Sequence, residues 1–259
     1  MLKSNNLYLG DCLDLLAKIE DQTIDLVFLD PPYNLQLNKV LTRPNHSIVN
    51  GVNQDWDKFD SYSSYDDFTF SYLTECKRVL KPDGGLWIIG SYHNIFRIGK
   101  ILQDLNFWIL NDVIWAKSNP LPNFRATRLT NAHETLIWCS KKPKSKYQFN
   151  YHTLKVANED RQERSIWNFP ICSGKERLKN NKKQTAHPTQ KPLALMKKII
   201  IQSSIQGDLV LEPFAGTASF CAEAKYLGRN YIGFEKDETY FNLAIKRLKK
   251  IKSLKNDLL

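Results

Sequence analysis

The sequence predicts an α/β fold with a doubly wound, mostly parallel sheet, and three segments carry that prediction. Residues 24–29 form a short, almost continuous apolar run, which is typical of a strand buried on both faces of a parallel sheet. Residues 208–235 read as strand, helix and strand, the pattern of a βαβ unit. Residues 65–80 repeat apolar side chains at helical spacing. With 259 residues, 42% of them hydrophobic, the chain can form one large domain.

The other expected elements follow from the same two periodicities. Apolar and polar residues alternate in 107–115 and 134–139, which favours two strands of a hairpin with a long connection. Proline at position 192 suits the first turn of a helix. Further strands are expected at residues 7–9 and 86–90, and further helices after Asp11, at 95–105 and at 237–255.

The chain carries a formal charge of +10, and most of that excess lies in one block. Between residues 141 and 191 there are thirteen lysines and arginines but four acids. A basic block with weak periodicity favours a polyanion as partner over an ordinary solvated surface. Its aromatic residues are expected to form a small core rather than to stack on bases. They are Tyr147, Phe149, Tyr151, Trp167 and Phe169.

The composition argues against several other classes of protein. No stretch approaches about 18 uninterrupted apolar residues, so we expect no membrane span. The first residues lack the hydrophobic region of a signal peptide. The five cysteines are scattered without a CxxC pair, which predicts free thiols in a reducing cytoplasm and no metal site.

The residues directly after the strand at 24–29 are the strongest functional signal. Asp30 places a carboxylate at the carboxyl end of that strand, where open α/β sheets bind ligands. Pro31 and Pro32 have fixed φ angles and no N–H group, so their carbonyl oxygens are acceptors on a stiff loop. Tyr33 adds a flat aromatic face. These groups suit an exocyclic amino group on a planar base, although an ordinary proline turn after a strand is the simpler alternative.

Asp30-Pro31-Pro32-Tyr33 resembles motif IV of the amino-methyltransferases that act on nucleic acid. Residues 91–96, 120–125 and 130–135 resemble the β-class DNA adenine-N6 methyltransferases of the HinfI and cell-cycle-regulated type, and the likeness covers nearly the whole chain. The resemblance implies the S-adenosylmethionine-dependent methyltransferase fold, with seven strands of which one is antiparallel. It also implies a permuted order, with the target-base half first and the cofactor half last. Asp30, Pro31, Pro32 and Tyr33 would then be catalytic.

The second half of the chain predicts a nucleotide site without a phosphate loop. Gly216 permits close approach of a ligand to the backbone, and Glu235, at a strand end, can bind two ribose hydroxyls. The Gly-x-Gly-x-x-Gly pattern of NAD sites is absent, and S-adenosylmethionine has no pyrophosphate that would need it. From spacing alone, helix capping explains Asp11 as well as ligand binding does. By resemblance, the residues that bind the cofactor are Asp11, Cys12, Lys191, Pro192, Glu212, Pro213, Phe214, Ala215, Gly216, Thr217 and Glu235.

Two positions of this half depart from the family pattern. The family has another glycine where Ala218 stands, and usually aspartate where Glu212 stands. We expect these changes to alter the shape of the loop and to weaken cofactor affinity without abolishing it.

The resemblance divides the chain into a catalytic domain, residues 1–140 and 191–259, and a basic inserted target-recognition lobe, residues 141–190. Double-stranded DNA is the implied partner. Residues 34–60 are predicted to be a DNA-facing loop, because a loop of this length inside a compact domain is commonly functional. The residues expected to contact DNA are Arg43, His46, His93, Asn94, Asn123, Arg125, Asn131, His133, Lys182 and Lys183.

The implied reaction is methyl transfer from S-adenosylmethionine to adenine N6 in duplex DNA, with the base flipped out of the helix. Cytosine-N4 methylation stays open, although Asp30 favours adenine because N4 enzymes more often carry serine there. A catalytically silent DNA-binding module stays open as well, although intact Asp30, Tyr33 and Glu235 argue against it.

GANTC is the implied target, since arginine reads guanine and asparagine reads adenine through paired hydrogen bonds. The resembling enzymes are commonly homodimers, and some act beside a cognate restriction endonuclease. They also continue into a further C-terminal DNA-binding domain, whereas this sequence stops just after the basic helix. We therefore expect this chain to compensate through a dimer partner or to discriminate less sharply.

Overall fold

The structure is a computed structural model that describes residues 2–35, 41–42, 48–49, 57–123, 126–179 and 184–254. Its strands are β1 (Asn6–Leu9), β2 (Ile24–Leu29), β3 (Leu41–Thr42), β4 (Ile48–Val49), β5 (Leu80–Gly90), β6 (Trp108–Lys117), β7 (His133–Ser140), β8 (Ile166–Phe169), β9 (Leu209–Glu212) and β10 (Asn230–Glu235). Its helices are α1 (Cys12–Leu16), α2 (Tyr62–Val79), α3 (Ile95–Asp104), α4 (Tyr151–Ala157), α5 (Leu193–Ser203), α6 (Ser219–Tyr226) and α7 (Glu238–Lys250).

The central sheet has eight strands in the order β1-β10-β9-β2-β5-β7-β6-β8. Strand β7 runs antiparallel to both of its neighbours, and the other pairs are parallel. The predicted mostly parallel sheet with one antiparallel strand is confirmed, but the expected count of seven strands is wrong. The additional strand is β8, which comes from the basic block and pairs with β6 at the edge of the sheet. Strands β3 and β4 form a separate antiparallel pair.

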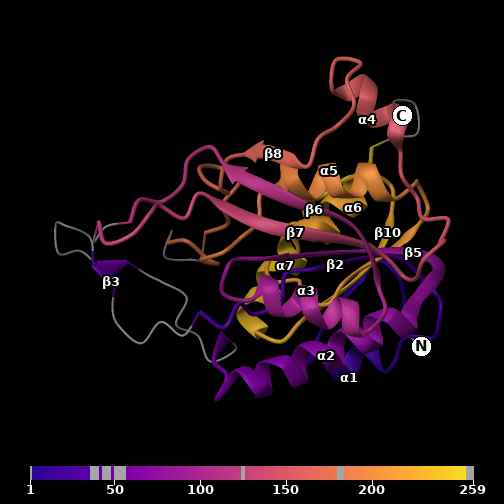
Figure 1. Ribbon diagram of the computed structural model, residues 1–259, viewed down its shortest axis with the longest axis horizontal. Coiled ribbons are helices and arrows are strands. Elements are labelled where there is room, and N and C mark those ends of the chain that lie inside the picture. Colours follow the sequence, from indigo (N-terminus) through magenta and orange to yellow (C-terminus); the bar gives the residue numbers. More distant parts are fainter. Residues whose placement is uncertain are drawn as a thin grey trace.

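Helices cover both faces of the sheet, as the doubly wound prediction requires. Helices α1, α2 and α3 bury their apolar sides in one cluster with the side chains of β2 and β5 that point to that face. Helices α5, α6 and α7 enclose a second cluster on the opposite face. Figure 1 shows the sheet between α2 and α3 on one side and α5 and α6 on the other. Two apolar clusters on the two faces of a sheet are what an alternating run of strands and helices produces.

The basic block contributes to the main core. The indole rings of Trp87 and Trp167 lie 5.5 Å apart, and Trp138 meets Tyr147 edge-on at 5.3 Å. The expected aromatic core is therefore confirmed for Tyr147, Trp167 and Phe169, which pack with the central sheet, whereas Phe149 and Tyr151 are exposed. Trp167 belongs to the strand that extends this sheet, so residues 166–169 are structurally part of the same layer as β6.

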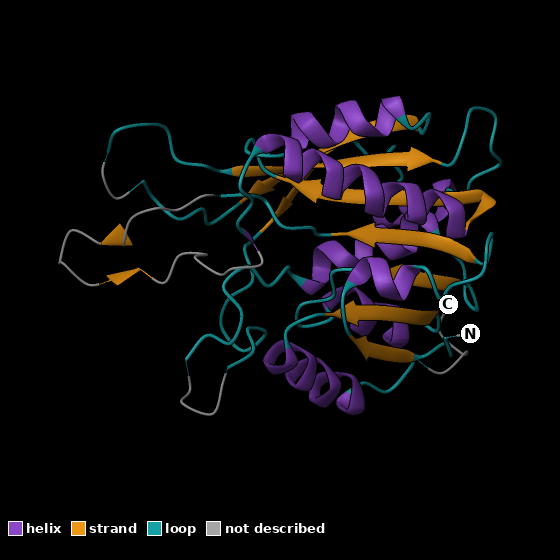
Figure 2. Cartoon of the chain, turned by 90° about the horizontal axis from the view of Figure 1, so that it is seen from below, coloured by secondary structure: helices purple, strands orange, loops and turns teal. Residues whose placement is uncertain are grey.

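Strands β2 and β9 are neighbours in the sheet, and the chain continues from them in opposite directions across the sheet. From β2 the chain passes through α2 to β5 on one side, and from β9 it passes through α6 to β10 on the other. Loops that leave neighbouring strands in opposite directions open a crevice at the carboxyl ends of those strands. Figure 2 shows long loops gathered at one end of the sheet and both chain termini at the other.

Local signals explain where individual elements begin. Helix α2 starts earlier than residue 65 because Ser61 and Ser64 form a reciprocal capping box ahead of the apolar stripe. All five cysteines are free, as predicted, and all five are buried. In the part of the chain that the structure describes, no helix combines the length and the apolar character that crossing a membrane requires.

Candidate active site

A cavity of about 670 Å³ opens at the carboxyl ends of four parallel strands. Its walls come from the residues that follow β1, β2, β9 and β10, together with the segment that leads into α5. The two halves of the predicted site, far apart in the sequence, therefore share one cavity. Its polar and charged lining includes Asp11, Asp30, Tyr33, Asp57, His187, Lys191, Glu212, Thr217 and Glu235.

The loop after β2 is held by two buried groups. The carboxylate of Asp57 accepts backbone N–H groups from residues 33–35 at 2.7 to 2.9 Å, and Asp57 is 3% exposed. The hydroxyl of Tyr65, on α2, donates to the carbonyl oxygen of Pro32 at 2.9 Å. The Pro32 carbonyl is therefore occupied, and the expectation that both proline carbonyls are free acceptors is wrong. The Pro31 carbonyl accepts no hydrogen bond from the described residues.

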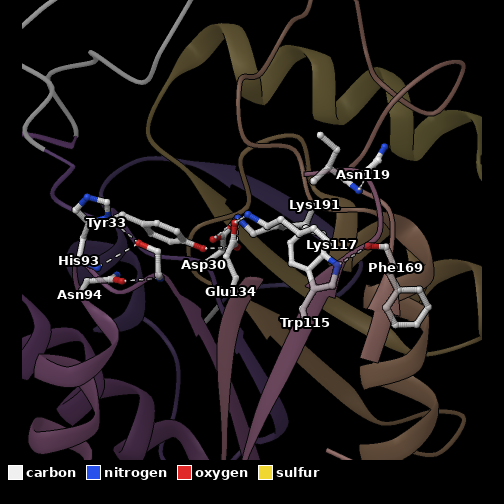
Figure 3. Close-up of polar contacts among 12 residues, drawn as sticks. Asp30, Tyr33, His93, Asn94, Trp115, Lys117, Asn119, Glu134, Phe169 and Lys191 are labelled. Carbon is white, nitrogen blue, oxygen red and sulfur yellow. Dashed lines mark hydrogen bonds and ion pairs between the residues drawn. The ribbon is translucent and has the colours of Figure 1, made fainter. Parts of the chain in front are cut away.

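Five polar side chains meet beside the loop that follows β2 (Figure 3). The ammonium of Lys191 lies 2.8 Å from Asp30 Oδ1 and 3.8 Å from Glu134 Oε2. The hydroxyl of Tyr33 donates to Glu134 Oε2 at 2.9 Å. On the other side, Lys117 Nζ contacts Glu134 Oε1 at 2.7 Å. Two carboxylates and two ammonium groups thus balance in charge, with Lys191 between both carboxylates.

The pKa values in this cluster follow from burial and charge pairing. Burial raises the pKa of Asp30, and the neighbouring Lys191 opposes that rise. Burial acts to lower the pKa of Lys191, but the two carboxylates more than offset it and the pKa is raised. Burial likewise acts to raise the pKa of Glu134, yet Lys191 and Lys117 hold it below its usual value. The pairing therefore favours the charged forms of Lys191 and Glu134.

The half of the site that is expected to bind the cofactor has a carboxylate at the carboxyl end of β10. Glu235 accepts N–H groups from Gly216 at 2.6 Å and from Asp237 at 2.7 Å, and burial raises its pKa to about 7. Gly216 has φ 52°, and a Cβ there would lie 3.3 Å from His187 Nε2. Glycine accommodates both this backbone angle and the close approach of the histidine without strain.

Glu212 stabilises the loop between β9 and α6 through hydrogen bonds. It is 3% exposed and accepts N–H groups from Phe220 and Cys221 at the start of α6. Burial raises its pKa to about 7. Arg247, on α7, donates to the Thr217 carbonyl at 3.0 Å from the other side. These contacts fix the backbone of residues 212–219.

Comparison with known proteins identifies the chain's relatives. Residues 24–246 match the DNA methylase family of N6 and N4 methyltransferases. The chain is 51% identical over 254 residues to the type II methyltransferase M.HinfI of Haemophilus influenzae, across 98% of this chain and 71% of the relative. The chain belongs to this DNA methylase family. The methylase is also 40% identical to the type II methyltransferase M2.MboI of Moraxella bovis, across 98% of this chain and 92% of the relative.

Solved structures share the methylase's fold. The complex of M1.HpyAVI with SAM matches with a TM-score of 0.67 and 28% identity, across 94% of this chain and 98% of that one. The cytosine-N4-specific PvuII DNA methyltransferase matches with a TM-score of 0.72 across 100% of this chain and 89% of that one. Its identity of 19% shows a common fold and no more. The predicted methyltransferase fold and enzyme class are therefore confirmed.

Residues expected at the cofactor take different positions in the methylase. Asp11 caps α1 by accepting from Leu13 N at 3.0 Å, and its other oxygen meets Lys236 at 3.1 Å, so capping and cavity lining coincide. Cys12 lines the same wall, where burial raises its thiol pKa to about 12. Lys191 contacts Asp30 rather than the loop after β9. Pro192 caps α5 and is not part of the cavity wall.

Ala218 adopts the left-handed conformation, with φ 55° and ψ 49°. The glycine that the family has at this position is thereby explained, because a side chain costs about 1 kcal/mol in that region. Its methyl group is fully buried in the core, which offsets part of the strain. Ala218 thus adopts a conformation that glycine also adopts readily, and the expected effect on loop shape and cofactor affinity stays a prediction.

The residues expected to contact DNA lie partly within the described part of the chain and partly outside it. Asn131 and His133 are exposed beside β7, and Asn123 donates to the carbonyl of Arg128 in the same loop. His93 is half-buried and stacks on Tyr92 at 4.0 Å. Burial and the nearby Arg128 lower its pKa. Arg43, His46, Arg125, Lys182 and Lys183 lie outside the described residues.

Among the candidates that the structure describes, Asn94 is the one that is buried. It is 1% exposed, its Oδ1 accepts from Ser91 N at 3.0 Å, and its Nδ2 donates to the Tyr65 hydroxyl at 3.1 Å. Because Tyr65 in turn holds the Pro32 carbonyl, Asn94 supports the loop after β2 from behind. Its expected contact with a base is therefore wrong.

Four residues of the site were missed by sequence reasoning. Glu134, on β7, contacts Lys191, and Lys117, on β6, contacts Glu134. Asp57 and Tyr65 reach the loop after β2 across 24 and 33 residues of sequence. Glu134 carried a usable signal, because it is a charged residue directly before an apolar strand and belongs to the block 130–135. Arg128, whose guanidinium contacts the Tyr92 hydroxyl at 2.5 Å, is a further exposed cation on this side.

Proposed function

We propose that the methylase transfers a methyl group from S-adenosylmethionine to adenine N6 in duplex DNA, at GANTC sites and with the target base flipped out. The observation that carries the proposal is the position of Asp30 and Tyr33. Both line the cavity that the cofactor half closes from the other side. The 51% identity to M.HinfI supports the adenine-N6 assignment.

The cofactor half suits S-adenosylmethionine. S-adenosylmethionine, when bound, supplies an activated methyl group. Glu235 would accept hydrogen bonds from its ribose hydroxyls, and the backbone at Gly216 leaves room for close approach. Asp11 and Phe214 line the same wall and would flank the adenosine part. The cavity of about 670 Å³ is large enough for a ligand of this size beside a base.

The base half would bind and orient the amino group of adenine. Asp30 would accept one amino hydrogen, and the Pro31 carbonyl, which has no donor among the described residues, would accept the other. Tyr33 would stack on the ring. Its hydroxyl is held by Glu134, so the ring plane is fixed before the base arrives. A base paired inside the duplex cannot reach these groups, which is why flipping is required.

Cytosine-N4 methylation is the competing assignment, and the shared fold of the PvuII enzyme leaves it chemically reasonable. A carboxylate and a carbonyl acceptor fit either amino group. Tritium transfer from labelled cofactor to DNA, followed by digestion and nucleoside chromatography, separates the assignments. We expect label in N6-methyldeoxyadenosine. Label in N4-methyldeoxycytidine would replace the adenine assignment, and absence of transfer would point to a DNA-binding module.

The first prediction concerns the target sequence. Matched duplexes that carry GANTC, its single-base variants or a shuffled site should differ sharply in methylation rate. One wrong base pair typically costs about 1–3 kcal/mol, which corresponds to roughly a 5- to 140-fold loss. We expect at least that loss in kcat/KM for each variant. Equal methylation of the shuffled duplex would overturn the assignment of GANTC.

The second prediction concerns salt. If lysines of the basic block contact phosphates, DNA affinity should fall steeply with salt through release of counterions. Replacing Lys182 and Lys183 by alanine should reduce the logarithmic salt slope by about one per contact, for unrelated sequences as well as for GANTC.

A matched control for the salt experiment is the pair Lys249 and Lys250. These exposed lysines lie in the last turn of α7, outside the basic block. Their replacement by alanine removes the same charge and should leave the salt slope unchanged. Equal slopes for both pairs would show that the basic block acts only through net charge.

Three further parts of the proposal concern the setting of the enzyme. The methylase would act in the cytoplasm as a homodimer on double-stranded DNA, beside a cognate restriction endonuclease. The type II designation of both curated relatives supports the restriction setting. Residues 141–190 would serve as the target-recognition region, with β8 anchoring it to the sheet.

A further inference from the structure

The ammonium of Lys191 occupies an unusual position in the described structure. It is 6% exposed, and it contacts Asp30 Oδ1, the carboxylate that the proposed function assigns to the amino group of adenine. An ammonium and an exocyclic amino group are both N–H donors. The free enzyme therefore already has a donor at the carboxylate where the substrate's donor should bind (Figure 3).

Burial explains why this place is filled. A buried carboxylate without a partner is strongly destabilising. The side chain of Asp30 is 18% exposed at the base of the cavity. Without bound DNA, Lys191 favours the charged form of Asp30.

A second acceptor lies next to the same ammonium. Glu134 Oε2 is 3.8 Å from Lys191 Nζ, beyond the 2.8 Å of the contact with Asp30 but within reach of a small side-chain movement. The Tyr33 ring centroid is 5.1 Å from the ammonium, so the face of that ring borders its path. An incoming adenine is neutral and cannot balance the cluster. The ammonium would therefore stay inside it and change partner.

We propose that Lys191 holds the place of the adenine amino group on Asp30 in the DNA-free enzyme and moves to Glu134 when the flipped base arrives. Lys191 is thus a positioning residue of the target-base site, and Glu134 is its second acceptor. This inference rests on the proposed function. It makes binding of the amino group an exchange of one N–H donor for another, so that neither carboxylate is left unpaired.

The exchange predicts the preference for adenine over purine, which lacks the amino group. This preference is the ratio of the affinities for two duplexes that carry adenine or purine at the target position. Binding of GANTC duplexes with either base at the target position would be measured at pH 8.5 with S-adenosylhomocysteine, where no methyl transfer occurs. In the wild-type enzyme the amino group must displace Lys191, so the preference for adenine is partly cancelled. Purine weakens the base pair in every variant alike, and therefore the comparison between variants removes that effect.

Two substitutions should move this preference in opposite directions. Lys191→Met removes the competing donor, and the preference for adenine should rise by about tenfold, the value of one hydrogen bond to a charged group. Glu134→Gln keeps an acceptor for Tyr33 but removes the charge that would receive Lys191, so the preference should fall below that of the wild type. Affinity for the purine duplex reports whether each variant still folds and binds DNA.

Lys191→Met should also change the pH dependence of adenine binding. Asp30 loses the ammonium that favours its charged form, so its pKa rises further. The acidic limit of binding, which is the pH below which affinity for the adenine duplex is lost, therefore moves to higher pH. A side chain that only packs would leave that limit in place. An unchanged limit would overturn the link between the two residues.

The remaining outcomes distinguish a failure of the exchange from a failure of the proposed function. If the preference for adenine falls or stays the same in Lys191→Met while the wild type methylates adenine, Lys191 remains on Asp30 and the exchange is wrong. If the wild type does not methylate adenine in DNA, the proposed function fails and this inference fails with it.

Discussion

Replacing Asp30 by alanine is expected to lower the rate of methyl transfer by a factor of at least about a thousand while leaving cofactor affinity nearly unchanged. The carboxylate lies at the end of the cavity that is proposed to bind the base, and it contacts Lys191, not the loop after β9. Its loss removes a hydrogen bond to a charged group, worth about 1.5–3 kcal/mol, and the orientation of the amine on which the reaction depends. Single-turnover methylation and calorimetric titration with S-adenosylhomocysteine measure the two effects separately.

Asp30→Asn is the matched control for shape. It keeps the size of the side chain and one carbonyl acceptor, but it removes the charge that pairs with Lys191. Because Lys191 retains Glu134 at 3.8 Å, neither variant should leave the ammonium isolated. We expect Asn to lose slightly less activity than Ala. A comparable loss of cofactor affinity in both variants would contradict the division of the cavity into base and cofactor halves.

The fold was predictable because its main elements carry strong local signals. The run at 24–29, the βαβ unit at 208–235 and the stripe of α2 each show one clear periodicity, and each became the expected element. Strand β8 was missed because it is short and half-exposed, and only Trp167 of its four residues is buried. The pairing of β8 with β6 depends on a neighbour about fifty residues earlier, which no local pattern encodes.

The site was predictable where a motif is continuous in sequence. Asp30 and Tyr33 lie in the cavity with Glu235, as their places at strand ends required. Glu134 and Asp57 were missed because they act on this motif through contacts that span 101 and 24 residues. Asn94 failed for the opposite reason. Its residue type suits a base contact, but folding places it under Tyr65, and burial is not readable from residue type in a loop.

Glu235→Ala is expected to weaken cofactor binding about a hundredfold. Two ribose hydroxyls donating to an ionised carboxylate contribute roughly 1.5 kcal/mol or more each, and 1.4 kcal/mol is a factor of ten. Glu235→Gln keeps one acceptor and should lose about tenfold. Calorimetric titration with S-adenosylhomocysteine measures both. Methyl transfer at saturating cofactor should recover in these variants, unlike in Asp30→Ala, because the base half is intact.

The same carboxylate should make cofactor affinity depend on pH. The pKa of Glu235 is about 7 in the free enzyme, and hydroxyl donors favour its charged form, so binding lowers that pKa. Affinity should therefore be full above pH 8 and fall by up to about tenfold per unit as pH drops below 7. Glu212 also has a pKa of about 7, but it is present in every variant. The difference between wild type and Glu235→Gln thus isolates Glu235. An identical slope in the two proteins would assign the titration to Glu212, whose protonation would loosen the start of α6.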